Sequence, residues 1–350
     1  MYYSWHCEYT DDRQEHNYMP HQERELLLQN VCNGKIKGQN NVAKMMGNET
    51  MHPKCHLVHH FRPYLYLGPF HIEIQYYFPL RSVFHDFFSH KELEWIKEYT
   101  EPILSESRYA LITNNKSKSE KTNVISVEHS SIGNSDNYVS YKDQVTLPMN
   151  DILYDEEEKY VRLDVESKIL EYEVLPLRDP YKFTIKNAML FMVSKRIELA
   201  TQLNVTTRHG STTFKATNYG LSGSLLTHVD PLGYEKGVPL VESKHHLMRT
   251  GDFIASFMGW FAHTWAGGST GFTTKNFEGR LVPRRGSAGF WINLFTCHER
   301  DMRSMHAGCP ILKGSKWILN KWINSYDQWK YWPCYLKQHV SFDVFKGLTW

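Results

Sequence analysis

The sequence predicts an α+β fold in which short β-strands form a sandwich or jelly roll and helices pack outside it. After Asn204 the chain breaks into short apolar or alternating runs that are separated by Gly and Pro, as in sheets built from many short strands. Two segments upstream have the apolar spacing of helices. With 41% hydrophobic and 22% charged residues, the composition is that of a globular protein.

The chain is expected to divide near residue 60. Residues 1–60 are polar and lack a sustained period, so they are predicted to be a linker or the remnant of an upstream region. Residues 61–350 are predicted to form the main domain, with its jelly-roll core at about 205–335.

The elements ahead of the core start with a predicted strand, Phe70–Phe78, whose residues alternate and are rich in aromatics. Ser89 and Glu92 have the spacing of a capping box, in which each side chain satisfies a free helix N–H. A helix is therefore predicted over His90–Tyr99, ending before Pro102 because proline cannot continue a helix.

The middle of the chain is predicted to hold a long surface loop and a second helix. Residues Asn114–Asn150 are rich in Ser, Asn and Lys, which indicates the loop. The acidic run Asp155–Glu158 is interpreted as a solvated helix face, because no His accompanies it. Apolar spacing predicts a helix over Thr184–Leu203. The strands expected after it include Phe214–Tyr219, Phe253–Phe261, Ser287–Leu294 and Lys316–Ile323.

Bulk properties exclude several classes of function. A formal net charge of +2 gives no indication of nucleic acid or of an anionic membrane as a partner. No apolar stretch reaches the length that a bilayer requires, and no signal peptide is visible at the start of this chain. None of the six cysteines forms a C-x-x-C pair, which argues against a zinc ribbon. These properties do not determine the cellular compartment of the protein.

The first candidate for chemistry is a metal site. Thr227-His-Val-Asp230 places a His and an Asp two residues apart, so on an extended strand both side chains point to one face. His306, at the end of a predicted strand, can supply the third ligand. Two imidazoles and one carboxylate form the facial triad that binds iron(II) and leaves open positions. Taken alone, the His-x-Asp pair favours a structural interpretation, with His228 capping a turn and Asp230 in a loop, and it is the downstream residues that favour a metal site.

The second candidate is Lys316, which follows His306 on a strand that is expected to return beside it. A lysine flanked by Trp317 and Ile318 requires a compensating anion if its ammonium is buried. The distal carboxylate of 2-oxoglutarate would fit that role. The alternative is a surface lysine whose stem lies along apolar side chains.

These residues also carry a resemblance to a known family. Asn218–Asp230, NYGLSGSLLTHVD, resembles the prolyl 4-hydroxylase signature N-Y-G-x-G-G-x-Y-x-x-H-x-D. Further blocks resemble the family in order, and the likeness spans roughly residues 25 to 335. These blocks are Leu28–Cys32, Phe61–Phe70, Gly251–Ser256, Ala266–Phe272, Gly286–Leu294 and His306–Trp322.

The resemblance implies an iron(II)- and 2-oxoglutarate-dependent dioxygenase with a double-stranded β-helix (jelly-roll) core. It implies iron at His228, Asp230 and His306, and 2-oxoglutarate held by Lys316. The resemblance further implies that the hydroxyl groups of Tyr219 and Thr270 contact 2-oxoglutarate and that Trp322 lines the same pocket. For Tyr219 and Trp322, ordinary core packing is the alternative.

The same resemblance implies partners, a compartment and cysteine pairs. L-ascorbate would be the reductant, a proline-rich or collagen-like polypeptide the substrate, and protein disulfide isomerase a beta subunit. Disulfides Cys309–Cys334 and Cys32–Cys55 are implied, whereas Cys7 and Cys297 have no assignable partner. Such bonds would place the chain in the lumen of the endoplasmic reticulum.

Two departures from the family lie on the substrate side of the predicted pocket. A family tyrosine is Leu225 here and a family arginine is Phe253, so a hydroxyl and a guanidinium that would position a substrate are missing. Three hypotheses follow: a peptidyl-proline 4-hydroxylase, the same oxygenase chemistry on another protein substrate, or a non-catalytic subunit that retains the fold.

Overall fold

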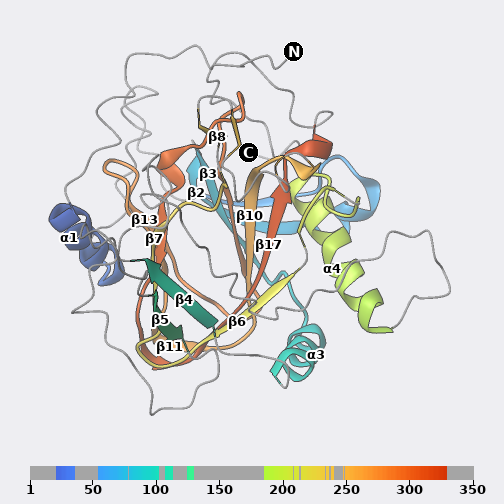
Figure 1. The fold of residues 1–350 in the computed structure, drawn as a ribbon. Coiled ribbons are helices and arrows are strands. Elements are labelled where there is room, and N and C mark those ends of the chain that lie inside the picture. The colour runs from blue at the N-terminus through green and yellow to red at the C-terminus, as the bar shows by residue number, and fades with distance from the viewer. Residues whose placement is uncertain are drawn as a thin grey trace.

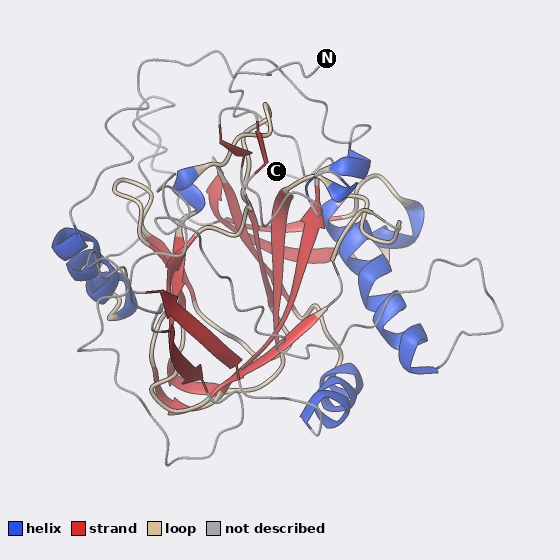
Figure 2. Ribbon diagram, in the orientation of Figure 1, coloured by secondary structure: helices blue, strands red, loops and turns tan. Residues whose placement is uncertain are grey.

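Antiparallel β-sheets dominate the protein, and helices are few (Figures 1 and 2). The computed structural model describes residues 21–35, 54–77, 79–101, 107–112, 124–129, 185–207, 209–212, 214–232, 234–235, 238–239, 247 and 249–328. Each pairing between the strands in these residues is antiparallel.

The largest sheet has seven strands and mixes segments from both halves of the chain. Its order is β1 (Lys54–Val58), β2 (Phe70–Tyr77), β3 (Leu80–His85), β14 (Ala288–Ile292), β10 (Phe253–Trp260), β17 (Lys316–Asn324) and β6 (Lys215–Tyr219).

A four-stranded sheet faces it, in the order β13 (Gly279–Leu281), β12 (Thr270–Phe272), β15 (His306–Gly308) and β7 (Leu225–His228). Two-stranded pairs complete the set: β11 (Thr264–Gly267) with β16 (Ile311–Gly314), β4 (Ser107–Ile112) with β5 (Val124–His129), and β8 (Tyr234–Glu235) with β9 (Val238–Pro239).

The outer face of the seven-stranded sheet is covered by α3 (His90–Thr100) and α4 (Ile185–Thr201) (Figure 1). Ile96 of α3 and Ile197 of α4 are buried in one apolar cluster with Phe257 and Leu319 of the sheet. Burying each of these side chains stabilises the fold by roughly 1.5–3 kcal/mol.

A partly buried charge pair links the two helices. Glu92 accepts hydrogen bonds from Ser89 at the start of α3 and binds Arg196 of α4, with 2.7 Å between Arg196 Nη2 and Glu92 Oε1. Burial alone would raise the pKa of Glu92, but the hydrogen bonds from Arg196 and Ser89 lower it below its ordinary value. The carboxylate therefore caps one helix while it fixes the other.

The inner face of the seven-stranded sheet packs against the four-stranded sheet. Met258, Trp260 and Ile318 from the large sheet form a second apolar cluster with Phe272 and Leu281 from the small one. Since successive residues of a strand point to opposite faces, alternate positions of β10 and β17 face the helices and the space between the sheets. The functional candidates lie on the inner positions.

A helix that the sequence pattern did not predict, α1 (His21–Cys32), packs on the four-stranded sheet. Three leucines in a row point to different sides of a helix, so α1 lacks the single apolar stripe on which sequence prediction depends. Its close approach needs Gly271, where a Cβ would come within 3.0 Å of Val31 and 3.3 Å of the Cys309 sulfur.

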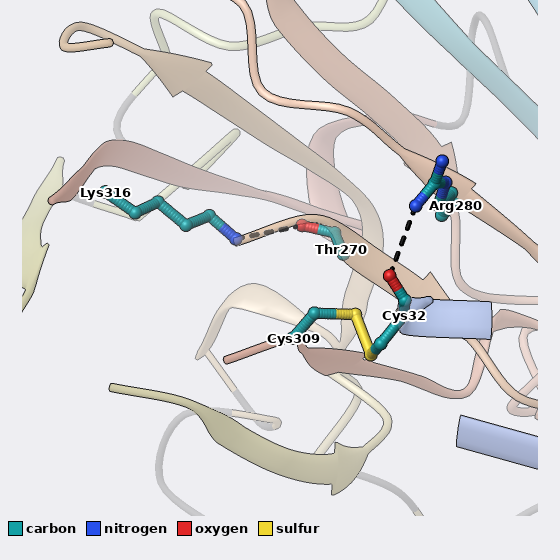
Figure 3. The surroundings of a disulfide bond; sticks show 5 residues. All are labelled: Cys32, Thr270, Arg280, Cys309 and Lys316. Atoms are coloured by element: carbon teal, nitrogen blue, oxygen red, sulfur yellow. Dashed lines mark hydrogen bonds between the residues drawn. A yellow bond between two sulfur atoms is a disulfide. The ribbon is translucent and has the colours of Figure 1, made fainter. Parts of the chain in front are cut away.

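The cysteine pairs implied by the resemblance are wrong for the residues that the structure describes. Cys32 at the end of α1 is bonded to Cys309, just after β15, and Arg280 donates a hydrogen bond to the Cys32 carbonyl oxygen (Figure 3). Cys55 is a free, exposed thiol. Cys297 is disulfide-bonded as well. Pairing cannot be deduced from spacing, and here the packing of α1 decides it.

Most predicted elements form, with small shifts at their ends. Strand β2, the capping box of α3, helix α4 and the strands β6, β10, β14 and β17 confirm the predictions made for these segments. The prediction of a long surface loop over Asn114–Asn150 is wrong in part, because β5 lies within it. Strand β1 was missed too, and His306 begins a strand, β15, and does not end one.

Two further predictions concern the acidic run and membrane-spanning helices. The acidic run Asp155–Glu158 lies outside the described residues. In the part of the chain that is described, no helix is both long and apolar enough to span a bilayer.

Candidate metal centre and its pocket

His228, Asp230 and His306 converge between the two sheets. One possible ligand atom from each lies within 4.8 Å of the others. The distance from Asp230 Oδ1 to His228 Nε2 is 3.5 Å, and from Asp230 Oδ2 to His306 Nε2 it is 3.8 Å. Ligand atoms bound about 2.1 Å from one ion and at right angles would be roughly 3 Å apart, so small side-chain movements suffice to bind a metal.

Sheet register explains why the two histidines meet. His306 of β15 lies directly opposite His228 of β7, and their ring centres are 4.4 Å apart. A β-bulge follows, after which Gly308 pairs with Leu225. Because the bulge inserts one residue into β7, Leu225 lies on the same face as His228.

The imidazole of His306 is held in the tautomer that a metal ligand needs. Its Nδ1 lies 2.9 Å from the Ser304 carbonyl oxygen, which can only accept, so Nδ1 carries the hydrogen and Nε2 offers its lone pair. Trp291 and Phe272 pack on the ring at centroid distances of 4.9 and 5.6 Å. Burial, together with the His228 charge, lowers the pKa of His306 to about 4, so this ring is neutral at pH 7 and ready to bind a cation.

Two further side chains orient the Asp230 carboxylate. Ser256 of β10 donates a short hydrogen bond to Asp230 Oδ2, and Asn293 donates to the Ser256 hydroxyl at 2.8 Å. Burial alone would raise the pKa of Asp230, but the nearby His306 and His228 and the Ser256 hydrogen bond lower it well below its ordinary value. Asp230 is therefore ionised, as a metal ligand must be.

The ligand set fits a divalent transition metal. Two imidazoles and one carboxylate are the facial combination typical of non-haem iron(II). Their partners, a backbone carbonyl and a hydroxyl, are of the kind that fixes ligand orientation in metal sites.

Lys316, the first residue of β17, reaches into the same interior. Its side chain is buried, and Nζ lies 3.3 Å from Thr270 Oγ1 on β12 (Figure 3). The ammonium also lies over the ring of Tyr219, 5.7 Å from its centre, and Tyr219 is its neighbour across the β6–β17 pairing.

Burial lowers the pKa of Lys316 to about 7. Among the described residues no carboxylate forms a salt bridge with it. An ammonium in this position gains most from an anionic ligand.

Trp322 lies on the inner face of β17 but toward the other end of the strand. It is paired with Ser256, at the level of the Asp230 carboxylate. Its indole stacks on the Phe253 ring, with 5.6 Å between centres and 20° between planes. The ammonium of Lys215 lies over the indole at 5.9 Å. Six residues along a strand correspond to roughly 20 Å, so Lys316 and Trp322 lie far apart along the inner face of β17.

Three of the residues that shape this site had no role in the sequence analysis. Ser256 and Asn293 both lie in blocks that carry the family resemblance. Ser256 is on β10 and Asn293 directly follows β14, and the alternation along these buried strands indicates the inner face. Lys215 had no such signal, because one lysine at the start of an edge strand looks like an ordinary surface residue.

Comparison with known proteins identifies relatives over most of the chain. The alpha-3 subunit of prolyl 4-hydroxylase from Mus musculus is 29% identical over 272 residues, which is 78% of this chain and 39% of the relative. The alpha-2 subunit from Caenorhabditis elegans is 28% identical over 281 residues, 80% of this chain and 40% of the relative. These matches confirm the resemblance predicted from the sequence. The chain spans about two fifths of the length of these relatives.

Solved structures give looser matches. A truncated form of the viral collagen prolyl hydroxylase from Paramecium Bursaria Chlorella virus-1 is 13% identical, with coverage of 70% of this chain and 89% of that one and a TM-score of 0.37. A prolyl-4-hydroxylase from Pseudomonas putida is 14% identical, with coverage of 42% and 68% and a TM-score of 0.27. No protein-family model matches the chain.

Proposed function

We propose that this chain is an iron(II)- and 2-oxoglutarate-dependent dioxygenase of the prolyl 4-hydroxylase type. The observation that carries the proposal is the convergence of His228, Asp230 and His306 in an interior that also holds the ammonium of Lys316. Similarity to prolyl 4-hydroxylase alpha subunits over 78% of the chain supports the same reaction class.

We also propose that the seven-stranded and four-stranded sheets form the two walls of a double-stranded β-helix. The strand order supports this fold, since neighbours in each sheet come from distant parts of the chain and the candidate ligands lie between the walls. In this proposal residues 61–350 are the catalytic domain and 1–60 a preceding region, which contributes α1, bonded to the small sheet, and β1 at the edge of the large sheet.

His228, Asp230 and His306 would hold the metal, with Ser256 fixing the carboxylate and Ser304 the His306 ring. Bound iron(II), with 2-oxoglutarate and dioxygen, supplies an oxidant that converts an unactivated C–H bond to C–OH while 2-oxoglutarate is converted to succinate and carbon dioxide.

The chain's own side chains would orient the cosubstrate and exclude water. Lys316 would bind the distal carboxylate of 2-oxoglutarate, and Thr270, which contacts the ammonium, would help to place it. Tyr219 would close that side of the pocket. Trp322 would line the end near Asp230, where the substrate enters. Fixed geometry of this kind is the main contribution that a protein makes to such a reaction.

The proposed substrate is proline in a collagen-like or proline-rich polypeptide, by analogy with the relatives. L-ascorbate is proposed as the reductant and protein disulfide isomerase as a beta subunit. The Cys32–Cys309 disulfide supports an oxidising compartment, for which we propose the lumen of the endoplasmic reticulum.

A succinate-release assay with a proline-rich peptide library, run with and without iron(II), tests this function. We expect iron-dependent succinate that increases with peptide and is lost in Asp230→Asn. Absence of any succinate, including the peptide-independent background, would favour a non-catalytic subunit.

A second candidate keeps the oxygenase chemistry but assigns it another protein substrate. Phe253 stacks on Trp322, and Leu225 lies across from Gly308, which pairs with Thr270, so two positions that are polar in the family pattern are apolar here. The double variant Leu225→Tyr, Phe253→Arg should then gain activity on collagen-like peptides. No gain would argue against this candidate.

A further inference from the structure

Lys215 places a second cation on the inner face of the seven-stranded sheet, at a different level from Lys316. It lies on β6 opposite Asn320 of β17, and Asn320 in turn pairs with Met258 of β10. Paired residues share a face of the sheet, so Lys215 points to the inner face with Met258. Its ammonium extends toward the Trp322 indole, 5.9 Å from the ring centre.

The ammonium of Lys215 has no hydrogen-bond acceptor among the residues that the structure describes. Burial lowers the pKa of Lys215, and the Asp230 carboxylate offsets part of that effect. The two groups form no salt bridge. Burying a cation without a hydrogen-bond acceptor costs free energy. A metal ion bound to Asp230 would neutralise the carboxylate charge that partly stabilises the Lys215 ammonium. With metal bound, the ammonium would therefore gain from an anionic ligand.

Aromatic rings lie beside the Lys215 ammonium, since Trp322, over which it lies, stacks on Phe253. Lys215 is therefore a positive charge next to these rings and near the candidate metal ligand Asp230. In such surroundings a charge-assisted hydrogen bond is stronger than in water.

We propose that Lys215 is a specificity-determining residue whose ammonium binds a side-chain carboxylate of the polypeptide substrate, next to the residue that is hydroxylated. The substrate class is then an acidic, proline-containing polypeptide. This inference rests on the proposed function.

The position of Lys215 separates it from the cosubstrate anchor. Lys316 pairs with Tyr219, and Lys215 lies four residues before Tyr219 on the same strand, roughly 13 Å away along the backbone. Its side chain extends toward Trp322, away from Lys316. Lys316, and not Lys215, is therefore the lysine assigned to the distal carboxylate of 2-oxoglutarate.

Three synthetic peptides test the proposal, with Glu, Gln or Lys immediately before each proline of an otherwise identical collagen-like sequence. The full chain, loaded with iron(II) and 2-oxoglutarate, is assayed for kcat/KM by succinate release. Peptide binding is measured separately by calorimetry without dioxygen. We expect the Glu peptide to be preferred over the Gln peptide by about tenfold or more, the scale of one charge-assisted hydrogen bond.

Variants at Lys215 identify the residue responsible. Lys215→Gln should abolish the preference, Lys215→Glu should reverse it toward the Lys peptide, and Lys215→Arg should keep it. Lys313→Gln is the matched control, because Lys313 is exposed on β16, and it should behave as wild type. The KM for 2-oxoglutarate should stay unchanged in each.

Two results would overturn the inference: no preference for Glu over Gln in the wild-type chain, or a raised KM for 2-oxoglutarate in Lys215→Gln with the peptide preference intact. A different result would contradict the proposed function without contradicting this inference. If no peptide releases succinate but the Glu peptide still binds wild type more tightly than Lys215→Gln, recognition by Lys215 stands and the oxygenase assignment falls.

Discussion

His306 lies directly opposite His228 in the pairing of β15 with β7, so a single antiparallel register brings both imidazoles close to the Asp230 carboxylate. Contacts outside the metal site hold β15 in this register with β7. Strand β15 also pairs with β12, and the residue after it, Cys309, is bonded to α1. The geometry of the candidate metal centre is therefore a property of the whole four-stranded sheet.

Asp230→Asn should remove metal binding while the fold is kept. The substitution preserves the size of the side chain but removes the charge that the two imidazoles face, so iron(II) affinity should fall by more than the roughly 10–100-fold that loss of an outer partner causes. Calorimetric titration with iron(II) under anaerobic conditions measures it. Asp86→Asn, at an exposed position, is the control and should bind as wild type. Equal affinity in both variants would contradict the proposed ligand set.

Ser256→Ala should weaken the metal centre without removing it. The hydroxyl holds Asp230 in place and is itself held by Asn293, so its loss should reduce iron(II) affinity by about 10–100-fold. The variant Ser194→Ala removes a buried hydroxyl of α4 that donates to the Leu190 carbonyl oxygen, and it should leave affinity unchanged. The same calorimetric titration compares them, and a wild-type affinity in Ser256→Ala would rule out the orienting role.

Lys316→Met should lower 2-oxoglutarate affinity by roughly 100-fold, because the carboxylate loses its charged partner. In the wild-type chain that affinity should also fall as pH rises above about 7, where the lowered pKa of Lys316 lets the ammonium lose its proton. Lys316→Arg should abolish this pH dependence, since a guanidinium stays charged. Binding titrations at pH 6.5 and 8.5 measure both effects. A pH-independent wild-type affinity would contradict the assignment.

Stability of the metal-free chain should depend on pH through the same lysine. An unfolded lysine has a pKa near 10.4, whereas burial lowers that of folded Lys316 to about 7. Between these values the unfolded chain binds one more proton at this residue, so the free energy of unfolding should rise with pH from about 7 to 10. Denaturant unfolding across this range measures the slope. Lys316→Met should reduce the slope but keep the part due to Lys321, whose pKa burial also lowers to about 7.

The Cys32–Cys309 bond can be tested directly. Peptide mapping of the non-reduced chain should recover the Cys32–Cys309 cross-link. Cys32→Ser should lower the free energy of unfolding by about 2–5 kcal/mol and free α1 from the small sheet, whereas Cys55→Ser should have no such effect, because Cys55 is a free exposed thiol. Recovery of a Cys32–Cys55 or Cys309–Cys334 peptide would instead restore the pairs that the family resemblance implied.

Local patterns in the sequence were enough to predict the elements whose apolar side chains are regularly spaced. The capping box at Ser89 and Glu92 and the alternation of β2 and β10 depend on residues a few positions apart, and each predicted element forms. The candidate ligands could be named for the same reason, since His228 and Asp230 are near neighbours and His306 and Lys316 lie in recognisable blocks.

Only the tertiary structure decided which distant residues meet. Helix α1 has no apolar stripe of its own and is placed by contacts with β12 and by the bond from Cys32 to Cys309. The roles of Ser256 and Lys215 depend on strand register, which pairs Ser256 with Trp322 and Lys215 with Asn320. Register and packing arise from long-range contacts that leave no local pattern, so the sequence determined the chemistry available to this protein and the fold determined which groups share it.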